Sequence, residues 1–476
     1  MNRHLLGILD VGKTHTRFLT ADSQGDVLSE HSRENGYGPR SVGIRQLDLA
    51  GIEEWLCGVL SKHPDRDHID TLIPIAHGAA GALIDGDGAV LAVPDYEDSS
   101  FDEVAERYRA LRDPFDQTYS PFLPLGLNLG RQLFFLQERA PELWRKARTL
   151  LLYPQYWAWR MCGIAASELT SLGCHTDLWR PLQGRSTELA VRAGWQTLLP
   201  PLRSARDCLG ITSPEFLHRT GLKAQCRVIC GLHDSNASYL AHLAHIPEDP
   251  FAVISSGTWT IVMARGADPQ CVREPLDMLI NVDASGSPVP TARFMGGREY
   301  QAIAGEAGMH IEASIEDANA VLSREALALP SFSQAGGPFA GVRGRTIYAD
   351  GLDARGQAAL ASLYVALMSD YLLDLMRFTG TVLVDGPFAH NALYLQILAE
   401  LRLRDRICTS ETQYPAAVAA AYLANVTACR PVSQRVITAS NCLQTLERYR
   451  KLWREQIQRP GISRNDLLSQ GRRPCA

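Results

Sequence analysis

The chain has 476 residues, of which 46% are hydrophobic and 21% charged, and its formal net charge is −5. This composition is typical of a folded soluble protein of about two or three domains, and the lack of a basic surplus excludes nucleic acid as an expected partner. Eleven cysteines without paired spacing predict free thiols in a reducing compartment. No apolar run reaches membrane-spanning length and no signal-peptide core opens the chain, so we expect a cytoplasmic protein without membrane contact.

The first predicted element is a strand over residues 5–10, followed by a short loop and a β-rich segment over residues 16–21. Residues 7–14 match the phosphate-loop pattern GxxxxGK[ST]. That motif requires a helix after its lysine, whereas the strand, turn and strand found here predict an antiparallel meander. A P-loop NTPase is therefore the least favoured interpretation, and it would require a helix that begins at Lys13.

A hairpin loop that holds phosphate is the favoured interpretation of the same segment. Gly12 lets backbone N–H groups approach an anion, and the side chains that could donate to the anion are those of Lys13, Thr14 and Thr16. Asp10, at the end of the strand, is placed to hold Mg²⁺ through water. An ordinary hairpin would be the simpler interpretation if this loop stood alone.

The same scheme is repeated in the second half of the chain. Residues 251–263 again place a small polar loop, Ser255-Ser256-Gly257-Thr258, between two apolar strands. The repeat predicts an α/β fold of two ribonuclease-H-like domains, of the actin/hexokinase ATPase type, which face each other across a cleft and hold ATP. We assign residues 1–245 and 246–460 to the two domains and residues 461–476 to a loose tail.

Between the two loops, a strand over residues 71–76 leads to His77-Gly78, and a strand over residues 227–230 leads to Gly231-Leu232-His233-Asp234-Ser235. A helix over residues 236–245 follows. Asp234 thus lies at the carboxyl end of a strand, where open α/β sheets hold ligands. Taken alone, such an Asp is most often only a helix cap, and a lone His such as His77 is most often only solvated.

The remaining predicted elements follow from hydrophobic periodicity. Helices are expected at residues 51–62, 127–139, 194–202, 213–220, 299–308, 354–380, 392–403, 416–428 and 443–457. A strand over residues 381–384 leads to Gly386, and the next helix begins just after Asn391. A Gly before a helix start can cradle a nucleotide, although Gly-Pro is equally a plain turn.

In this order, the segments resemble the FGGY carbohydrate kinases, and among them the rhamnulokinase and fuculokinase branch. Asp10-x-Gly12-x-Thr14-x-x-Arg17 resembles the family's first phosphate loop, DxGTTxxR, with Lys13 in place of a small residue. The other matching motifs are Ser255-Ser256-Gly257-Thr258-Trp259 (SSGTW), Gly231-x-His233-Asp234 (GxHD) and Asn391–Glu400 (the end of the adenosine motif). The resemblance covers most of residues 5–455, and of the adenosine motif's three glycines only Gly386 remains.

The resemblance implies ATP-dependent phosphorylation of a hydroxyl group of a small sugar, a ketose such as a 6-deoxyhexulose or a pentulose. It implies that Asp234 is the general base and that Asp10 and Asp234 hold Mg²⁺. Contacts to the nucleotide and its phosphates are implied for Lys13, Thr14, Thr16, Arg17, Gly257, Thr258, Gln301, Gly386 and Asn391. Contacts to the sugar are implied for His77, Gly78, His233, Ser235 and Arg293.

Two further expectations complete this interpretation. A homodimer is the default assembly for such a protein. The alternative function is a catalytically silent sugar- or nucleotide-binding member of the same fold, because the Gly386-Pro387-Phe388 segment departs from the family pattern.

Overall fold

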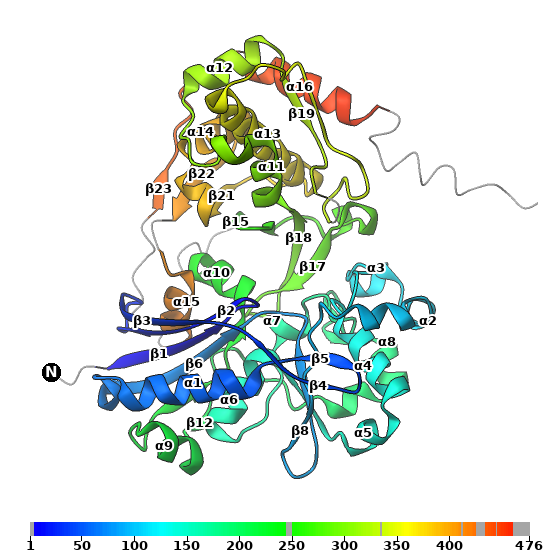
Figure 1. Ribbon diagram of the computed structural model, residues 1–476, viewed down its shortest axis with the longest axis vertical. Helices are drawn as coiled ribbons and strands as arrows, with labels where there is room; N and C mark the ends of the chain where they lie inside the picture. Colours follow the sequence, from blue (N-terminus) through cyan, green and yellow to red (C-terminus); the bar gives the residue numbers. More distant parts are fainter. Residues whose placement is uncertain are drawn as a thin grey trace, which may run out of the picture. The chain divides into compact units, whose positions relative to one another are not determined.

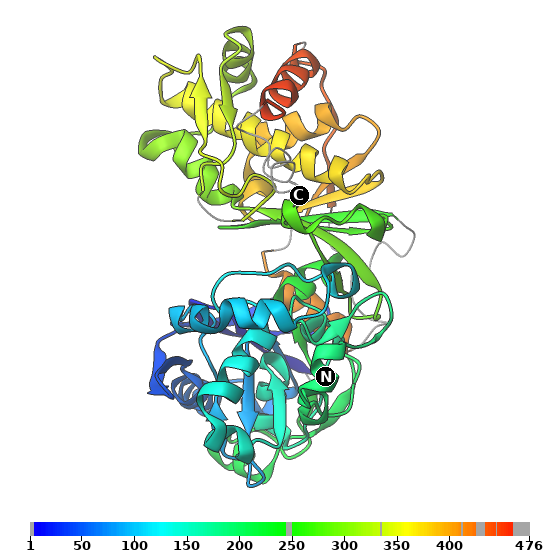
Figure 2. The same ribbon diagram turned by 90° about the vertical axis from the view of Figure 1, so that its right-hand side faces the viewer.

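The computed structural model describes residues 4–243, 250–333, 336–410, 413–424, 434–443 and 445–459. The chain divides into two compact units, which Figures 1 and 2 show from two directions. Unit 1 comprises residues 1–245, 280–288 and 412–432, and unit 2 comprises residues 246–279, 289–411 and 433–476. The two later segments that return to unit 1 have no place in the predicted domain ranges, because periodicity identifies a helix but not the sheet against which it packs.

Unit 1 is built on a mixed sheet in the strand order β12-β13-β6-β1-β2-β3, with β14 paired to β6. The strands are β1 (Leu5–Val11), β2 (His15–Ala21), β3 (Val27–Glu34), β6 (Ile69–Ala76), β12 (Cys208–Ile211), β13 (Arg227–Ile229) and β14 (Leu232–His233). The first three strands form an antiparallel meander, as predicted. The helix at Lys13 that a P-loop NTPase requires is absent, because residues 15–21 form β2, so that interpretation is wrong.

Both faces of this sheet are covered by helices, which explains why β1 is apolar at nearly every position. Leu5, Leu9 and Val11 of β1 face one core cluster, together with residues of α1 (Leu49–Lys62) and α6 (Tyr153–Cys162). Leu6 and Ile8 face the other cluster, together with residues of α10 (Asp234–Leu243) and α15 (Pro415–Ala424). In Figure 1, α10 and α15 lie side by side on the sheet, although they are far apart in the sequence.

The rest of unit 1 surrounds this sheet with smaller elements. They are β4 (Tyr37–Ser41), β5 (Ile44–Leu47), β7 (Gly81–Ile84), β8 (Val90–Ala92), β9 (Thr149–Leu152), β10 (Trp179–Arg180), β11 (Arg185–Ser186), α2 (Ala105–Leu111), α3 (Phe115–Thr118), α4 (Leu129–Arg139), α5 (Pro141–Lys146), α7 (Leu169–Leu172), α8 (Glu188–Arg192) and α9 (Pro214–Thr220). The predicted helix over residues 194–202 is wrong: only a 3₁₀ turn, Trp195–Leu198, forms before Pro200 and Pro201.

Unit 2 repeats the central arrangement of unit 1. Its strands are β15 (Phe251–Ser256), β16 (Thr260–Arg265), β18 (Pro288–Phe294), β21 (Thr381–Asp385), β22 (Arg406–Ser410) and β23 (Gln434–Val436), with β17 (Leu279–Val282) at the point where the chain returns to unit 1. β15 is antiparallel to β16 and parallel to β21, just as β1 is antiparallel to β2 and parallel to β6. This correspondence is the repeat that the sequence predicts.

The helices and minor strands of unit 2 are α11 (Gly296–Gly308), α12 (Ile315–Ser323), β19 (Leu327–Leu329), β20 (Arg345–Ile347), α13 (Ala354–Leu375), α14 (Ala392–Leu401) and α16 (Leu446–Ile457). Among the described residues, α13 alone is long and apolar enough to span a membrane, but 83% of its most apolar window is buried inside the protein. α13 therefore has the properties of a core helix. The predicted tail at residues 461–476 lies outside the described residues.

Candidate active site

The candidate site in unit 1 lies where three parallel strands end together. Asp10 and Val11 of β1 pair with Ile75 and Ala76 of β6. Leu232 and His233 of β14 pair with the same two residues from the other side of β6. The strand register therefore brings Asp10, His77 and Asp234 to one edge of the sheet, where open α/β sheets hold ligands.

Asp10 forms a charge pair across the first hairpin. The antiparallel register sets it opposite Arg17, and the Arg17 Nη2 donates to Asp10 Oδ2 at 2.6 Å. Burial raises the pKa of Asp10, Arg17 lowers it, and the nearby Asp234 carboxylate raises it further. A carboxylate whose charge is destabilised by a second carboxylate is a natural ligand for a cation.

Asp234 begins α10 immediately after β14. Its Oδ1 accepts the Ser235 backbone N–H at 2.6 Å and lies 3.2 Å from Nε2 of His233. The surrounding protein desolvates the carboxyl group and raises its pKa, which the nearby His77 opposes. Because 36% of the Asp234 side chain is still exposed, the carboxylate is accessible to a ligand.

The turn before Asp234 depends on a close contact between strands. Gly231 has φ 76°, and a Cβ at this position would lie 2.0 Å from the carbonyl oxygen of Pro74 in β6. The buried amide of Gln155 donates to the carbonyls of Cys230 and Gly231, at 3.2 Å each. Glycine and this side-chain clamp together fix the direction in which the chain leaves β13.

His233 lies buried beside Asp234. Burial lowers the pKa of His233 to about 4, so the imidazole is neutral at pH 7; its Nε2 lies 3.2 Å from Asp234 Oδ1 and 3.8 Å from Cys174 Sγ. A Cβ on Gly78 would lie 2.6 Å from that Nε2 and 3.5 Å from Cys174 Sγ. Gly78 is therefore required by the position of the His233 ring.

His77 is buried at the end of β6 and has a fixed tautomer. Its Nδ1–H donates to the Gly78 carbonyl at 2.8 Å, and its ring contacts those of Tyr153 and Tyr96, with centroid distances of 4.8 and 5.6 Å. Burial lowers the pKa of His77, against the opposing effect of Asp234. A neutral His77 leaves Nε2 as a hydrogen-bond acceptor beside the carboxylate.

The sequence prediction missed a buried chain of hydrogen bonds that leads to His233. The His233 backbone N–H donates to Thr170 Oγ1 at 3.0 Å, and the Thr170 hydroxyl donates to Glu168 Oε2 at 2.6 Å. Glu168 also accepts the Thr170 and Ser171 backbone N–H groups, as the N-cap of α7. Burial raises the pKa of Glu168 to about 7. No sequence pattern connects residues 168–171 to residue 233.

The loop after β1 is held by Asn35, which the sequence prediction also missed. The Asn35 backbone N–H donates to the Thr14 carbonyl at 2.8 Å, and its side-chain amide donates to the Gly12 carbonyl at 2.9 Å. The buried Thr16 hydroxyl donates to Asn35 Oδ1 at 2.7 Å, whereas Thr14 is exposed. Of the two predicted threonines, Thr14 is accessible to a ligand and Thr16 stabilises the loop.

Lys13 makes its contacts with acidic and aromatic side chains. Its ammonium group donates to Asp95, which is buried, and lies 3.6 Å from Glu97. It also lies over the rings of Tyr37 and Tyr96, at 5.4 and 5.1 Å from their centroids. The phosphate loop and the predicted sugar residue His77 share a cavity of about 220 Å³ whose lining includes Lys13.

In unit 2, the second predicted loop is tied to the segment around Gly386. Ser256 Oγ donates to the Asp385 carbonyl at 2.6 Å and accepts the Phe388 backbone N–H at 2.9 Å. Gly386 has φ 76°, and a Cβ there would lie 2.0 Å from the Ser256 carbonyl oxygen. The one glycine that remains from the adenosine motif is thus the one that the strand contact requires.

Phe388 occupies the place where the family motif has a further glycine. It is buried, and its ring centroid lies 6.0 Å from that of Tyr300 and 5.0 Å from that of Tyr394. Asn391 caps α14, since its Oδ1 accepts the Tyr394 backbone N–H at 2.9 Å. Gln301 is exposed on α11.

The start of α11 packs directly against the second loop. A Cβ on Gly297 would lie 2.2 Å from the Gly257 carbonyl oxygen, and Thr258 beside it is exposed. Arg293, at the end of β18, donates to both carboxylate oxygens of Asp277 at 3.0 Å and lies 4.9 Å from the Trp259 ring centroid. Arg293 belongs to unit 2, whereas the other four predicted sugar contacts belong to unit 1.

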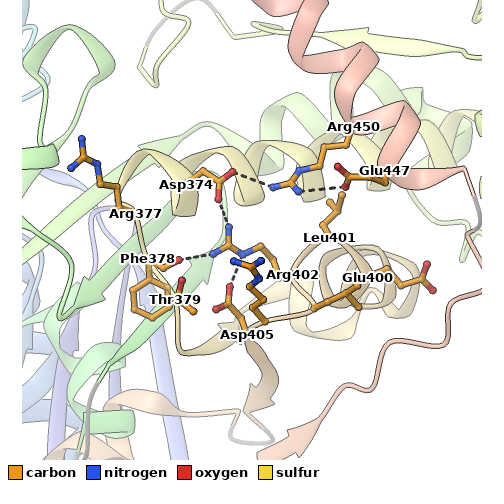
Figure 3. A pocket seen from close by; sticks show the side chains of 12 residues that line it. Asp374, Arg377, Phe378, Thr379, Glu400, Leu401, Arg402, Asp405, Glu447 and Arg450 are labelled. Carbon is orange, nitrogen blue, oxygen red and sulfur yellow. Dashed lines mark hydrogen bonds and ion pairs between the residues drawn. The ribbon is translucent and has the colours of Figure 1, made fainter.

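A larger cavity of about 470 Å³ in unit 2 includes no residue of the second loop in its lining, which consists mainly of charged residues (Figure 3). Arg402 donates to Asp405 at 2.6 Å and also contacts Asp374, and Arg450 donates to Asp374 at 3.1 Å (Figure 3). These arginines are neutralised by their own neighbours. Although this cavity is larger than the one beside the first loop, its arginines are already paired, so we do not assign it as the active site.

Among the described residues, no three His, Cys, Asp or Glu side chains gather as a ready-made metal site. The nine cysteines among those residues are all free, as expected. Mg²⁺ does not need such a cluster, because it is usually bound through one or two carboxylates, water and substrate phosphates. Asp10 and Asp234 fit that requirement.

The two matching sheets with their strand–loop–strand openings define an α/β protein of two ribonuclease-H-like domains, of the actin/hexokinase type. Residues 248–432 match the model for the carbohydrate kinase FGGY C-terminal domain. The crystal structure of a carbohydrate kinase from Novosphingobium aromaticivorans is 34% identical, with a TM-score of 0.88 over 96% of this chain and 99% of that chain. This chain belongs to the FGGY family of carbohydrate kinases, which are phosphotransferases with an alcohol group as acceptor.

Other relatives are more distant. An L-fuculokinase from Salmonella typhi is 26% identical over 275 residues, which cover 56% of this chain and 57% of that protein. The chain thus spans little more than half the length of the curated relative that it matches. A ligand-bound xylulose kinase from Lactobacillus acidophilus shares the fold, with a TM-score of 0.79 at 14% identity over 95% of this chain and 98% of that chain.

Proposed function

We propose that this chain is an ATP-dependent sugar kinase in which the Asp234 carboxylate accepts the proton of the sugar hydroxyl group. The observation that carries the proposal is that Asp234 follows β14 at the same sheet edge as Asp10 and His77, in a chain that belongs to a family of carbohydrate kinases. An alcohol is a poor nucleophile at neutral pH, and a positioned base typically contributes about 10²–10⁴-fold in rate.

The hydrogen bonds of Asp234 suit this role. Oδ1 accepts the Ser235 backbone N–H and lies 3.2 Å from the neutral His233, which leaves Oδ2 to accept from the sugar. The raised pKa makes the carboxylate a stronger base than a solvated aspartate. Phosphoryl transfer needs mainly alignment and charge stabilisation, so a fixed position is the main requirement on the base itself.

Each unit carries a loop that can contact phosphate. In unit 1, the exposed Thr14 and the backbone around Gly12 can donate to phosphate oxygens, and in unit 2 Gly257 and the exposed Thr258 can do the same. Asp10 and Asp234 would hold Mg²⁺, which neutralises phosphate charge when it is bound. Arg17 orients Asp10 through their 2.6 Å hydrogen bond.

The sugar would be a ketose, either a 6-deoxyhexulose or a pentulose. Support comes from the names of relatives, which include the L-fuculokinase above, a rhamnulokinase from Halalkalibacterium halodurans and a xylulose kinase from Bacillus subtilis. In this proposal the reaction takes place in the cytoplasm, and a free sugar is the partner. A coupled assay of ADP release over pentuloses, 6-deoxyhexuloses and their aldose and polyol relatives tests it. Sugar binding without ADP release would favour a silent binder instead.

The role of Asp234 is tested by Asp234→Asn, which keeps the size of the side chain and removes the base. We expect kcat to fall by at least a factor of 100, while the affinity for ATP measured without Mg²⁺ stays within about twofold. Asp87→Asn, in an exposed turn, is the matched control and should retain full activity. An Asp234→Asn variant with more than a tenth of the wild-type kcat would exclude the role.

A further inference from the structure

A second cavity in unit 1 is lined by none of the residues to which we assign a sugar or phosphate contact. It measures about 480 Å³ and is formed by α7, α10, α15 and the short segments at residues 202–206 and 284–285. All of these segments belong to unit 1. Small-molecule sites are typically clefts of about 300–1,000 Å³, so the cavity is large enough for a ligand of its own.

Most of the lining of this cavity is apolar. Leu169 comes from α7, Leu240 and Leu243 come from α10, and Leu202 comes from the segment before β12. Leu202 is 47% exposed, and Tyr422 of α15 adds an aromatic ring. A ligand with an apolar body would remove part of this surface from water, which favours binding.

The charged side chains that the structure describes in this lining are two arginines. Arg203 and Arg206 are both exposed, and neither forms an ion pair within the part of the chain that the structure describes. Arg206 lies over the ring of Tyr422, at 5.5 Å from its centroid. A guanidinium group presents its N–H donors in a fork that matches the oxygens of a carboxylate or a phosphate.

The flanking carboxylates accept hydrogen bonds from other groups. Asp207 Oδ2 accepts the Ser204 backbone N–H at 3.2 Å. Asp283 Oδ1 accepts the backbone N–H and the hydroxyl group of Ser285, at 2.9 and 2.6 Å. Neither Asp207 nor Asp283 lines the cavity. An anion in the cavity would therefore meet two arginines and neither of these carboxylates.

The cavity is bounded by both elements that position Asp234. Leu169 is the first residue of α7, and the next residue, Thr170, accepts the His233 backbone N–H at 3.0 Å. Leu240 and Leu243 lie on α10, the helix that begins at Asp234. A ligand that packs against these leucines would therefore contact α7 and α10 at the same time.

We propose that this cavity is a second ligand site, which binds an organic anion with an apolar body, and that its occupancy stabilises α7 and α10. The leucines and the Tyr422 ring pack against the apolar body, and Arg203 and Arg206 bind the anionic group, a phosphate or a carboxylate. The inference goes beyond the proposed kinase function and does not depend on it.

Calorimetry on the full chain with naphthyl phosphate tests the site, with naphthoate, naphthol and inorganic phosphate as comparisons. We expect the better of the two naphthyl anions to bind at least tenfold more tightly than naphthol or inorganic phosphate, and this anion identifies the head group. Saturating MgADP should leave its affinity within twofold. The inference is overturned if naphthol binds as tightly as both anions, or if MgADP displaces the anion.

The two arginines are tested together by the double substitution Arg203→Met and Arg206→Met, at exposed positions where the fold should be retained. We expect Kd for the naphthyl anion to rise at least tenfold while Kd for naphthol stays within twofold. Arg343→Met, at an exposed position in unit 2, is the control and should change neither constant. An unchanged affinity of the double variant for the anion would overturn the inference.

Leu202→Ser tests the apolar part of the site separately from its charge. Because Leu202 is half-exposed, its replacement should leave the fold intact. We expect it to weaken the binding of the naphthyl anion and of naphthol by the same factor, at least threefold. Unchanged binding of both compounds would show that they do not occupy this cavity.

Hydrogen exchange tests the effect of occupancy on the two helices. Saturating naphthyl anion should slow amide exchange in α7 and α10 at least twofold in the wild type and not in the double arginine variant, while α16 of unit 2 stays unchanged. Binding without this protection would overturn the link to α7 and α10. Failure of the proposed kinase function, seen as no ADP release with any sugar, is a separate result, because calorimetry and exchange require no turnover.

Discussion

The backbone N–H of His233 donates to the hydroxyl group of Thr170 at 3.0 Å, although the two residues are 63 positions apart. The same hydroxyl donates to the buried Glu168 at 2.6 Å. Asp234 is the next residue in the chain, so the short helix α7 anchors the backbone from which the proposed base projects. Glu168 and Thr170 are positioning residues in this arrangement, since they act through His233.

Thr170→Val should disturb this anchor while it preserves the shape of the side chain. The substitution leaves the His233 N–H without its partner, while Glu168 Oε2 keeps the Ser171 N–H; the loss costs about 1–3 kcal/mol of the free energy of unfolding. We expect kcat to fall about tenfold with little change in KM for ATP. Thr170→Ser, which retains the hydroxyl group, should restore most of kcat. If Ser and Val reduce kcat equally, the hydroxyl group does not position the base.

Glu168 should make stability depend on pH. Its pKa is raised from 4.5 to about 7 in the folded protein, so between these values the folded state binds the proton more tightly than the unfolded state. Stability from this group is therefore fully present below pH ~4.5 and is lost as the pH rises toward 7, by about 3 kcal/mol. Denaturant unfolding of the wild type and of Glu168→Gln at several pH values measures the difference, which should grow with pH. If the free energies of unfolding of the wild type and of Glu168→Gln change with pH in the same way, the pKa of Glu168 is not raised in the folded protein.

Gly78→Ala should displace the imidazole of His233, because the added Cβ would lie 2.6 Å from its Nε2. We expect kcat/KM for the sugar to fall at least tenfold, since the His233 ring lies 3.2 Å from the Asp234 carboxylate. Gly86→Ala is the matched control: its nearest neighbour, a carbon of Arg148, is 3.8 Å away, and its activity should be unchanged. Full activity of Gly78→Ala would show that His233 can move without consequence.

Gly386→Ala should destabilise the protein in two ways, through an unfavourable backbone conformation and through a steric clash of the new Cβ. Gly351→Ala has only the first effect and is therefore the matched control. Both glycines have φ near +75°, but a Cβ on Gly386 would lie 2.0 Å from the Ser256 carbonyl oxygen, whereas nothing lies within 4 Å of one on Gly351. The backbone alone costs about 1–2 kcal/mol, and overpacking adds about 1–3 kcal/mol. Thermal unfolding and MgADP affinity should both suffer more in Gly386→Ala. Equal effects would mean that the strand contact relaxes.

The sequence predicts those parts of the fold and site that depend on local pattern. Apolar strands with small polar loops identify both hairpins, and the strand before Asp234 places that residue at a sheet edge. Contacts between distant segments leave no such pattern. Neither the link from Thr170 to His233 nor the clamp of Asn35 on Gly12 can be inferred from spacing.

The contacts of the Lys13 ammonium group cannot be predicted from the sequence, for a related reason. Its neighbours in the sequence are those of a phosphate-binding lysine, and only the tertiary structure brings Asp95 and Tyr96 to its ammonium group. The helix predicted over residues 194–202 failed because hydrophobic periodicity does not register the break that two consecutive prolines impose.

The packing of α15 against β1 also bears on how this protein can be synthesised. Ala417, Ala420 and Leu423 share a core cluster with Leu6 and Ile8, which leave the ribosome some four hundred residues earlier. A nascent chain that ends at residue 245 therefore still presents an uncovered apolar sheet face, and the first unit matures only when translation is nearly complete. Recombinant fragments cut there should aggregate unless residues 412–432 are supplied in trans.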